Sequence, residues 1–245
     1  MGEVLAIISR KGGGGKTTTA QALADGIRRA GHKVLLIDLD SQANLTNAMG
    51  ADPGGMNATD LFDGVKPARL IQHTNNGDII AGCGDLAAAD VILTDNTQLK
   101  KCLRPFQSEY DYILIDTPAS YGRLTMNALN AANSAIITIE PATFGAAGLE
   151  DLAAIVKQIR RKNKNLILRG IILTRCDTRS NEVKTTIANI EAAAAGLKTQ
   201  LIRPFIRSTI KVQEAQHRQR NLIDYAPKST AAVDYMEVVK VLLNK

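Results

Sequence analysis

The sequence predicts an α/β fold, with a single doubly wound, mostly parallel sheet and helices on both faces. Three observations support this prediction. Short apolar runs typical of strands alternate along the chain with longer segments of helical periodicity. The strand cores, such as 113–115, are continuously apolar, as expected for strands buried on both faces. A glycine-rich turn also joins the first strand directly to the first helix.

Seven strands and six helices are expected along the 245 residues, with no internal repeat and no linker that divides the chain, so 1–245 is one domain. The strands are Val4–Ser9, Lys33–Asp38, Asp78–Ala81, Tyr112–Asp116, Ala135–Glu140, Leu168–Thr174 and Gln200–Ile206. The helices are Lys16–Ala30, Thr97–Gln107, Leu124–Asn133, Ala146–Asn163, Asn181–Ala194 and Ser229–Leu243. Residues Gly50–Gly64 are rich in Gly, Pro and Asp, which predicts a loop with a short helical turn.

Composition narrows the classes of protein. Aromatic residues make up 4% of the chain and Trp is missing, so the core must be built from Ala, Leu, Ile and Val. The net charge of +6 favours an anionic partner, although many proteins are mildly basic. Three scattered cysteines without a C-x-x-C argue against disulfides and Zn or Fe–S sites and fit a reducing cytoplasm. No apolar stretch approaches the roughly 20 residues of a membrane span.

The run from Arg10 to Thr18 carries the strongest chemical information. A glycine-rich loop between a strand and a helix directs backbone N–H groups at phosphate oxygens, and the helix N-terminus adds positive potential. Lys16 is placed to neutralise the outer phosphates, and the hydroxyl of Thr17 can bind Mg²⁺. The expected nucleotide contacts in this run are Lys11, Gly12, Gly13, Gly14, Gly15, Lys16, Thr17 and Thr18.

Two further apolar strands end in carboxylates, where ligands bind in open α/β sheets. Asp116 closes one of them and is expected to hold Mg²⁺. Asp38 and Asp40 follow the other, two residues apart, so both can face the site if the strand continues that far. Such a carboxylate can orient the water that attacks the γ-phosphate. Each aspartate alone could instead be a helix cap or a turn residue.

The three motifs KGGGGKTT, LLIDLDSQANLT and YILIDTPAS, in this order, resemble the nucleotide motifs of the ParA/MinD class of deviant Walker A ATPases. The similarity is greatest to short ParA-type partition ATPases and extends over essentially the whole chain. A usual P-loop has Gly where Arg10 stands; here a second lysine, Lys11, opens the glycine run instead. The glycine run begins so early that the N-terminal helix-turn-helix of longer partition ATPases is not expected.

The resemblance implies a role for each motif residue. Lys11 would reach across a dimer interface to the partner's nucleotide, and Lys16 would bind phosphate. Asp40 would serve the hydrolytic water and, with Thr17 and Asp116, the Mg²⁺ ion, so that Lys11, Lys16 and Asp40 form the expected catalytic set. Asp38 is expected at the nucleotide. The adenine would lie near Arg175, Pro204 and Phe205.

The function implied is that of a DNA-partition motor. ATP would drive formation of a sandwich homodimer that binds DNA without sequence preference. A ParB-like centromere-binding or adaptor protein would stimulate hydrolysis and release, positioning a plasmid, chromosome or other cargo. The alternative is a membrane-surface ATPase like MinD. A third class, an Fe–S carrier or metabolic enzyme of the same superfamily, is weakened by the missing C-x-x-C.

Two observations favour a DNA partner over a membrane partner. The protein is then expected in the cytoplasm, associated with the nucleoid. The apolar stripe of the C-terminal helix suits packing on the sheet, and its acids and bases are balanced. Basic residues gather in a late segment and are expected to contact DNA phosphates: Arg203, Arg207, Lys211, Arg218 and Arg220. A second basic cluster, residues 157–164, could contact DNA or be a solvated helix end.

Overall fold

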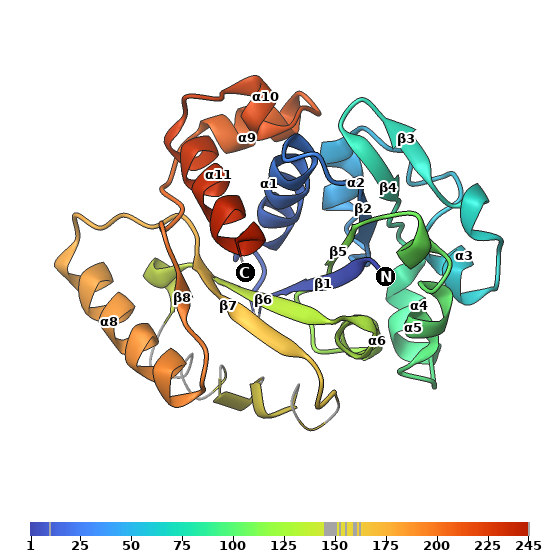
Figure 1. Ribbon diagram of the computed structural model, residues 1–245, viewed down its shortest axis with the longest axis horizontal. Helices are drawn as coiled ribbons and strands as arrows, with labels where there is room; N and C mark the ends of the chain where they lie inside the picture. The colour runs from blue at the N-terminus through green and yellow to red at the C-terminus, as the bar shows by residue number, and fades with distance from the viewer. Residues whose placement is uncertain are drawn as a thin grey trace.

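The computed structural model describes residues 1–9, 11–144, 151, 153–154, 156–158, 161 and 163–244, and it confirms the predicted α/β fold (Figure 1). One sheet has the strand order β3-β4-β2-β5-β1-β6-β7-β8, and every neighbouring pair is parallel except β3 with β4. The strands are β1 Glu3–Ile8, β2 Val34–Asp38, β3 Gln72–Thr74, β4 Gly77–Ile80, β5 Tyr112–Asp116, β6 Ser134–Ile139, β7 Ile167–Leu173 and β8 Leu201–Ile202.

Helices cover both faces of this sheet, as Figure 1 shows. One face packs against α1 Lys16–Arg29, α2 Asn44–Met49, α9 Lys211–His217, α10 Leu222–Tyr225 and α11 Thr230–Leu243. The other face packs against α3 Ala58–Phe62, α4 Leu86–Ile92, α5 Gln98–Cys102, α6 Arg123–Ala131 and α8 Asn181–Gly196.

The central strand β1 shows how the sequence produces these two layers. Leu5 and Ile7 belong to the core under α1 and α11, whereas Val4, Ala6 and Ile8 belong to the core under α6. Successive side chains on a strand point to opposite faces, so a continuously apolar strand stabilises both layers at once. The sheet therefore lies between the two helical layers. The carboxyl ends of its strands β1, β2 and β5 lie together at one edge.

The expected C-terminal helix is confirmed, with Ser229 capping it through a hydrogen bond from Ala232 N. Its apolar stripe is buried on α1, where the hydroxyls of Tyr235 and Thr19 are 2.9 Å apart. A Cβ added to Gly26 of α1 would come within 2.6 Å of Val239, so this glycine permits the close approach of the two helices.

Prolines explain two elements that are shorter than expected. The helix predicted over Thr97–Gln107 is α5 followed by a separate 3₁₀ turn, η2 Phe106–Ser108, with Pro105 between them. Proline lacks an N–H group and its ring clashes with the preceding turn of a helix. The strand predicted over Gln200–Ile206 contains only the two residues of β8, since Pro204 has no N–H for the ladder.

Several short elements were not predicted: β3, α2, α4, α9 and α10. The loop predicted over 50–64 contains α3, in agreement with the expected helical turn. Two further 3₁₀ turns, η1 Pro67–Arg69 and η3 Pro141–Thr143, connect larger elements. The helix expected over 146–163, with part of its basic cluster, lies largely outside the described residues.

Candidate nucleotide site

The glycine-rich loop between β1 and α1 adopts a backbone that requires glycine. Gly13 and Gly15 have φ values of 81° and 82°, in the left-handed region where a Cβ is unfavourable. At Gly14, a Cβ would lie 2.3 Å from the hydroxyl of Ser9. The hydroxyl of Thr174 donates a 3.1 Å hydrogen bond to Gly14 O, which fastens the loop to the end of β7. Arg10 lies outside the described residues.

The helix that follows is open to an anion at its first turn. Gly15 is the N-cap of α1 and supplies no side-chain cap, and the first turn contains no acidic residue. The first N–H groups of a helix have no partner within the helix, so here they face a ligand cavity instead. Lys16 is only 6% exposed and lines that cavity, which has a volume of about 620 Å³. Gly12, Gly13, Gly15, Thr17 and Thr18 also line it.

A buried carboxylate lies beneath the first turn of α1. Thr17 Oγ1 donates a 2.6 Å hydrogen bond to Asp116 Oδ2. The other oxygen, Oδ1, is buried and accepts no hydrogen bond from any residue that the structure describes. Burial, and then the charge of Asp38 on the adjacent strand, raise the pKa of Asp116. A divalent cation would satisfy the open oxygen and offset the repulsion between the two carboxylates.

These residues fit Mg²⁺ better than a metal held by protein alone. Within the described part of the chain, no three His, Cys, Asp or Glu side chains come together as a metal cage. Mg²⁺ keeps several waters and takes one or two protein oxygens together with phosphates. The hydroxyl of Thr17 and the open oxygen of Asp116 would supply such a pair of ligands beside the cavity.

The two aspartates after β2 have different surroundings. Strand β2 ends at Asp38, which is fully buried and accepts hydrogen bonds from Asp40 N, Thr46 N and Thr46 Oγ1. Asp38 therefore holds the loop beneath the cavity and is not among the residues that line it. This position does not support the expectation that Asp38 contacts the nucleotide. Asp40 is partly exposed and lines the cavity, where the attacking water would be expected.

Lys11 lies on the outside of the loop. Its ammonium donates a 2.9 Å hydrogen bond to the carbonyl of Thr143, and it is not among the residues that line the cavity. An exposed contact of this kind is readily exchanged for another acceptor. The geometry is therefore compatible with a lysine that acts on another subunit, and that role stays a prediction.

A second cavity of about 350 Å³ continues from the first, and the two share Gly15, Thr18, Arg175 and Gln216. Arg175 borders this second cavity, as expected, and its guanidinium donates a hydrogen bond to Glu140. Pro204 and Phe205 do not line this cavity. Phe205 packs against the core on the face of the sheet that α6 and α8 cover, and the guanidinium of Arg203 lies over its ring. The wall is formed instead by the segment that begins at Ile206 and runs into α9.

Sequence reasoning missed the contribution of α9. Gln216 Nε2 donates a 3.1 Å hydrogen bond to Thr18 Oγ1, which joins this helix to the first turn of α1. The sequence contains a weak sign of α9, since Val212 and Ala215 are apolar residues three apart and both pack into the core. Nothing in the sequence indicates that Gln216 reaches the nucleotide loop.

The five basic residues expected to contact DNA separate into two groups. Three of them form ion pairs: Arg203 with Glu191, Arg207 with Asp234, and Lys211 with Glu214. Arg207 makes two side-chain hydrogen bonds to Asp234, which is nearly buried, so its role includes holding α11 in place. Arg218 and Arg220 are exposed, and no ion pair with another described residue engages either one.

Comparison with known proteins agrees with this geometry. Residues 2–168 match a protein family described as an AAA domain. Sporulation initiation inhibitor protein Soj of Bacillus subtilis is 32% identical over 250 residues, covering 98% of both chains. Chromosome partitioning protein ParA of Myxococcus xanthus is 30% identical over 256 residues, covering 100% of this chain and 89% of that protein.

Solved structures share the whole fold. A variant of Cyanothece McdA in complex with ATP has a TM-score of 0.86 at 27% identity, covering 99% of this chain and 96% of that one. The septum site-determining protein MinD of Pyrococcus horikoshii, complexed with Mg-ADP, has a TM-score of 0.79 at 27% identity, covering 99% and 96%. The chain therefore belongs to the AAA-domain family that it matches and, within it, to the ParA/MinD class of P-loop ATPases.

Proposed function

We propose that this protein is a ParA-type partition ATPase whose ATP-bound homodimer binds DNA without sequence preference. Hydrolysis of ATP to ADP and phosphate is its reaction, and ATP and Mg²⁺ are its cofactors. The observation that carries the reaction is the open, buried oxygen of Asp116 beside Thr17, beneath an uncapped helix N-terminus. The relatives named for chromosome partitioning support the biological role.

The residues of the chain divide the work of catalysis. Backbone N–H groups of the loop and of the first turn of α1 bind the phosphates, and Lys16 neutralises their charge. Thr17 and Asp116 would hold Mg²⁺, which polarises the phosphoryl oxygens and offsets developing negative charge when bound. Asp40 lines the same cavity and orients the attacking water. Asp38 keeps Asp40 in place through its hydrogen bond from the Asp40 backbone.

The dimer is the step that makes DNA binding depend on ATP. In the proposed sandwich, Lys11 leaves its contact with Thr143 and completes the nucleotide site of the partner subunit. Association doubles the basic surface available to one DNA duplex, so affinity rises when ATP is bound. A ParB-like partner on the cargo then stimulates hydrolysis, and the subunits separate from the nucleoid.

In the described part of the chain, the C-terminal helix does not present the lipid-binding face that the MinD-like alternative requires. The apolar stripe of α11 is buried against α1, so it is not available to lie on lipid. Among the described helices, none is both long enough and apolar enough to span a membrane. Anionic lipid therefore serves as the competing ligand in the experiment that tests the proposal.

Co-sedimentation with DNA and with anionic liposomes, each with ATP, with ADP and without nucleotide, separates the two functions. We expect sedimentation with DNA only in ATP, equal for unrelated DNA sequences. Log affinity should fall linearly with log salt, by about 0.9 per phosphate neutralised. ATP-dependent recruitment to liposomes without DNA affinity would support the MinD-like function instead, and DNA binding independent of nucleotide would contradict the proposed cycle.

A further inference from the structure

The loop between α9 and α10 places two arginines side by side at the surface. Arg218 and Arg220 flank Gln219, and all three residues are exposed. Gln219 has a φ of 51°, a left-handed conformation that is sterically unfavourable for a residue with a Cβ. Residues that end a helix often adopt it, and here Gln219 N and Arg220 N donate hydrogen bonds to Gln216 O and Ala215 O at the end of α9.

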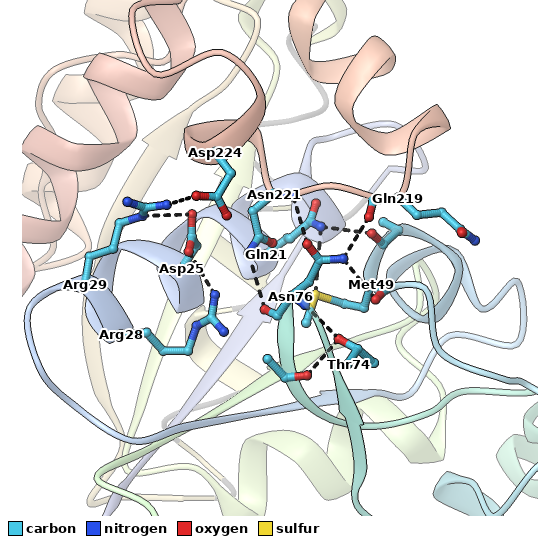
Figure 2. A network of polar contacts seen from close by, with 12 residues as sticks. Gln21, Asp25, Arg28, Arg29, Met49, Thr74, Asn76, Gln219, Asn221 and Asp224 are labelled. Carbon is cyan, nitrogen blue, oxygen red and sulfur yellow. Dashed lines mark hydrogen bonds and ion pairs between the residues drawn. The ribbon is translucent and has the colours of Figure 1, made fainter.

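A buried asparagine from a distant hairpin adds a tertiary contact to this helix end, at the carbonyl of Gln219. Asn76, in the turn between β3 and β4, is 8% exposed and donates hydrogen bonds to Gln219 O at 2.8 Å and Met49 O at 3.1 Å. Its Oδ1 accepts a 3.1 Å hydrogen bond from Asn221 N, and its backbone carbonyl accepts one from the Asn221 side chain. Figure 2 shows Asn76 at the centre of these contacts, between Met49, Gln219 and Asn221.

The far end of the loop is anchored to α1. Asp224 of α10 pairs with Arg29, which also contacts Asp25, as the left side of Figure 2 shows. The loop is therefore attached to the β3–β4 hairpin on one side and, through α10, to α1 on the other. These contacts hold the backbone that carries the arginine pair.

The arrangement concentrates positive charge beside one ring, whose hydroxyl donates a hydrogen bond to Glu214, an acid that also pairs with Lys211. The guanidinium carbons of Arg218 and Arg220 lie 5.7 Å and 5.9 Å from the centre of the same Tyr225 ring. Two like charges beside one ring repel each other, and an anion between them removes that repulsion. The other three basic residues of this region are already paired with acids, so their charge is less available to a ligand.

A concave surface extends from the arginine pair to the hairpin. A cavity of about 790 Å³ is bordered by Arg218, Gln219 and Arg220 on one side and by His73, Asn75 and Asn76 on the other. Two acids also border it; Asp224 is engaged by Arg29, and Asp52 accepts a hydrogen bond from Gly54 N. Exposed guanidinium groups with amide donors beside them suit the sugar–phosphate backbone of DNA, which offers paired phosphate oxygens.

We propose that Asn76 is a positioning residue for DNA binding: it holds Gln219 so that Arg218 and Arg220 bind the DNA backbone as a pair beside the β3–β4 hairpin. This inference rests on the proposed function, because it assumes that the ATP-bound protein binds DNA. It adds a surface formed by segments more than 140 residues apart and assigns the contact to two of the five basic residues.

The test compares Asn76→Ala with Asn165→Ala, an exposed asparagine in another turn that lies outside this cavity and outside the contacts around Gln219. Affinity for a 30-base-pair DNA of arbitrary sequence is measured with ATP over a series of salt concentrations. Asn76→Ala should bind DNA at least ten times more weakly, with a salt slope shallower by up to about 1.8 per subunit, since two phosphate contacts are lost. Asn165→Ala should change neither quantity, and basal ATP turnover should persist in both.

A double variant Arg218→Gln/Arg220→Gln should show the same loss and the same change of slope, and adding Asn76→Ala to it should cost little more. Its charge-matched control is Arg69→Gln/Arg104→Gln, which removes two exposed arginines elsewhere. Gln219→Val perturbs the loop backbone without changing the hairpin and should reproduce the effect if Asn76→Ala fails to fold. Gln219→Gly, which tolerates a positive φ, should retain affinity.

The outcomes distinguish the role of Asn76 from the proposed ATP-dependent DNA binding on which it rests. Wild-type protein that fails to bind DNA in ATP overturns the proposed function. Wild-type binding together with unchanged affinity and slope in Asn76→Ala, or a loss of affinity at unchanged slope, overturns the role of Asn76 alone. An equal loss in the Arg69/Arg104 control would mean that net charge, and not this surface, governs binding.

Discussion

Gln216 donates a hydrogen bond to the hydroxyl of Thr18, so a helix near the end of the chain is attached to the first turn of the nucleotide-binding helix. Gln216 borders both cavities, and Arg218 follows two residues later. The nucleotide cleft and the arginine pair are thus connected through one short helix. A shift of Thr18 when nucleotide binds would act on Gln216 of α9 through this hydrogen bond.

Removal of this link should weaken nucleotide binding. In Gln216→Ala, we expect ATP affinity to fall by about 2- to 10-fold, the value of one net hydrogen bond of roughly 0.5–1.5 kcal/mol. Titration with a fluorescent ATP analogue measures it, with the exposed neighbour His217→Ala as control. Unchanged affinity in Gln216→Ala would mean that the contact with Thr18 is incidental.

Lys16→Ala should strongly weaken ATP binding. Lys16 is nearly buried beside the cavity, and loss of a charge-assisted contact of roughly 1.5–3 kcal/mol lowers affinity by about 10- to 150-fold. Isothermal titration with ATP and Mg²⁺ provides the measurement, and the exposed Lys66→Ala is the matched control. A folded Lys16→Ala protein with normal affinity would refute the assignment of the phosphate site.

Asp40→Ala should retain ATP binding but hydrolyse it about 10²- to 10⁴-fold more slowly, because the carboxylate acts on water and not on the bound phosphates. The ATP-bound dimer should then accumulate, which sedimentation velocity detects. Asp38→Asn should differ, since Asp38 is buried and accepts three hydrogen bonds, two of them from Thr46. Its main effect should be a lower melting temperature. Normal turnover in Asp40→Ala would move the water-positioning role elsewhere.

Lys11→Ala should leave nucleotide binding by the monomer intact and impair dimerisation or turnover. Mixing it with Asp40→Ala subunits is the sharper measurement. In a mixed dimer, the site of the Lys11→Ala subunit keeps Asp40 and receives Lys11 from its partner, so one complete site forms and activity is partly restored. If Lys11 acts within its own chain, no complete site forms and the mixture stays inactive.

Arg207→Gln should destabilise the fold, because it leaves the nearly buried Asp234 without its guanidinium partner. The expected loss is about 1–2 kcal/mol, since Arg207 is half exposed and the pair is screened. Arg218→Gln should change stability by less than about 0.5 kcal/mol. Urea denaturation of both variants measures the difference, and equal stabilities would contradict the structural role of Arg207.

The sequence alone determined the α/β fold and the chemistry of the nucleotide loop. Continuous apolar runs such as 113–115 can be buried only inside a sheet covered on both faces, so the local pattern specifies the layers. The loop from Gly12 to Gly15 is equally local in origin, because its glycines and the helix behind them are adjacent in the sequence, although Thr174 also fastens the loop. Asp116 ends β5 next to this loop, as the sequence predicts, and its role as a Mg²⁺ ligand stays a prediction.

Only the tertiary structure decided which polar residues are free to act. Asp38 and Asp40 look alike in the sequence, but the strand ends between them, and one is buried under Thr46 while the other borders the cavity. Arg207 and Arg218 are both late basic residues, and only the fold brings a buried acid to the first. Partners of this kind come from elements 27 to 145 residues away, and no local sequence pattern encodes contacts at such separations.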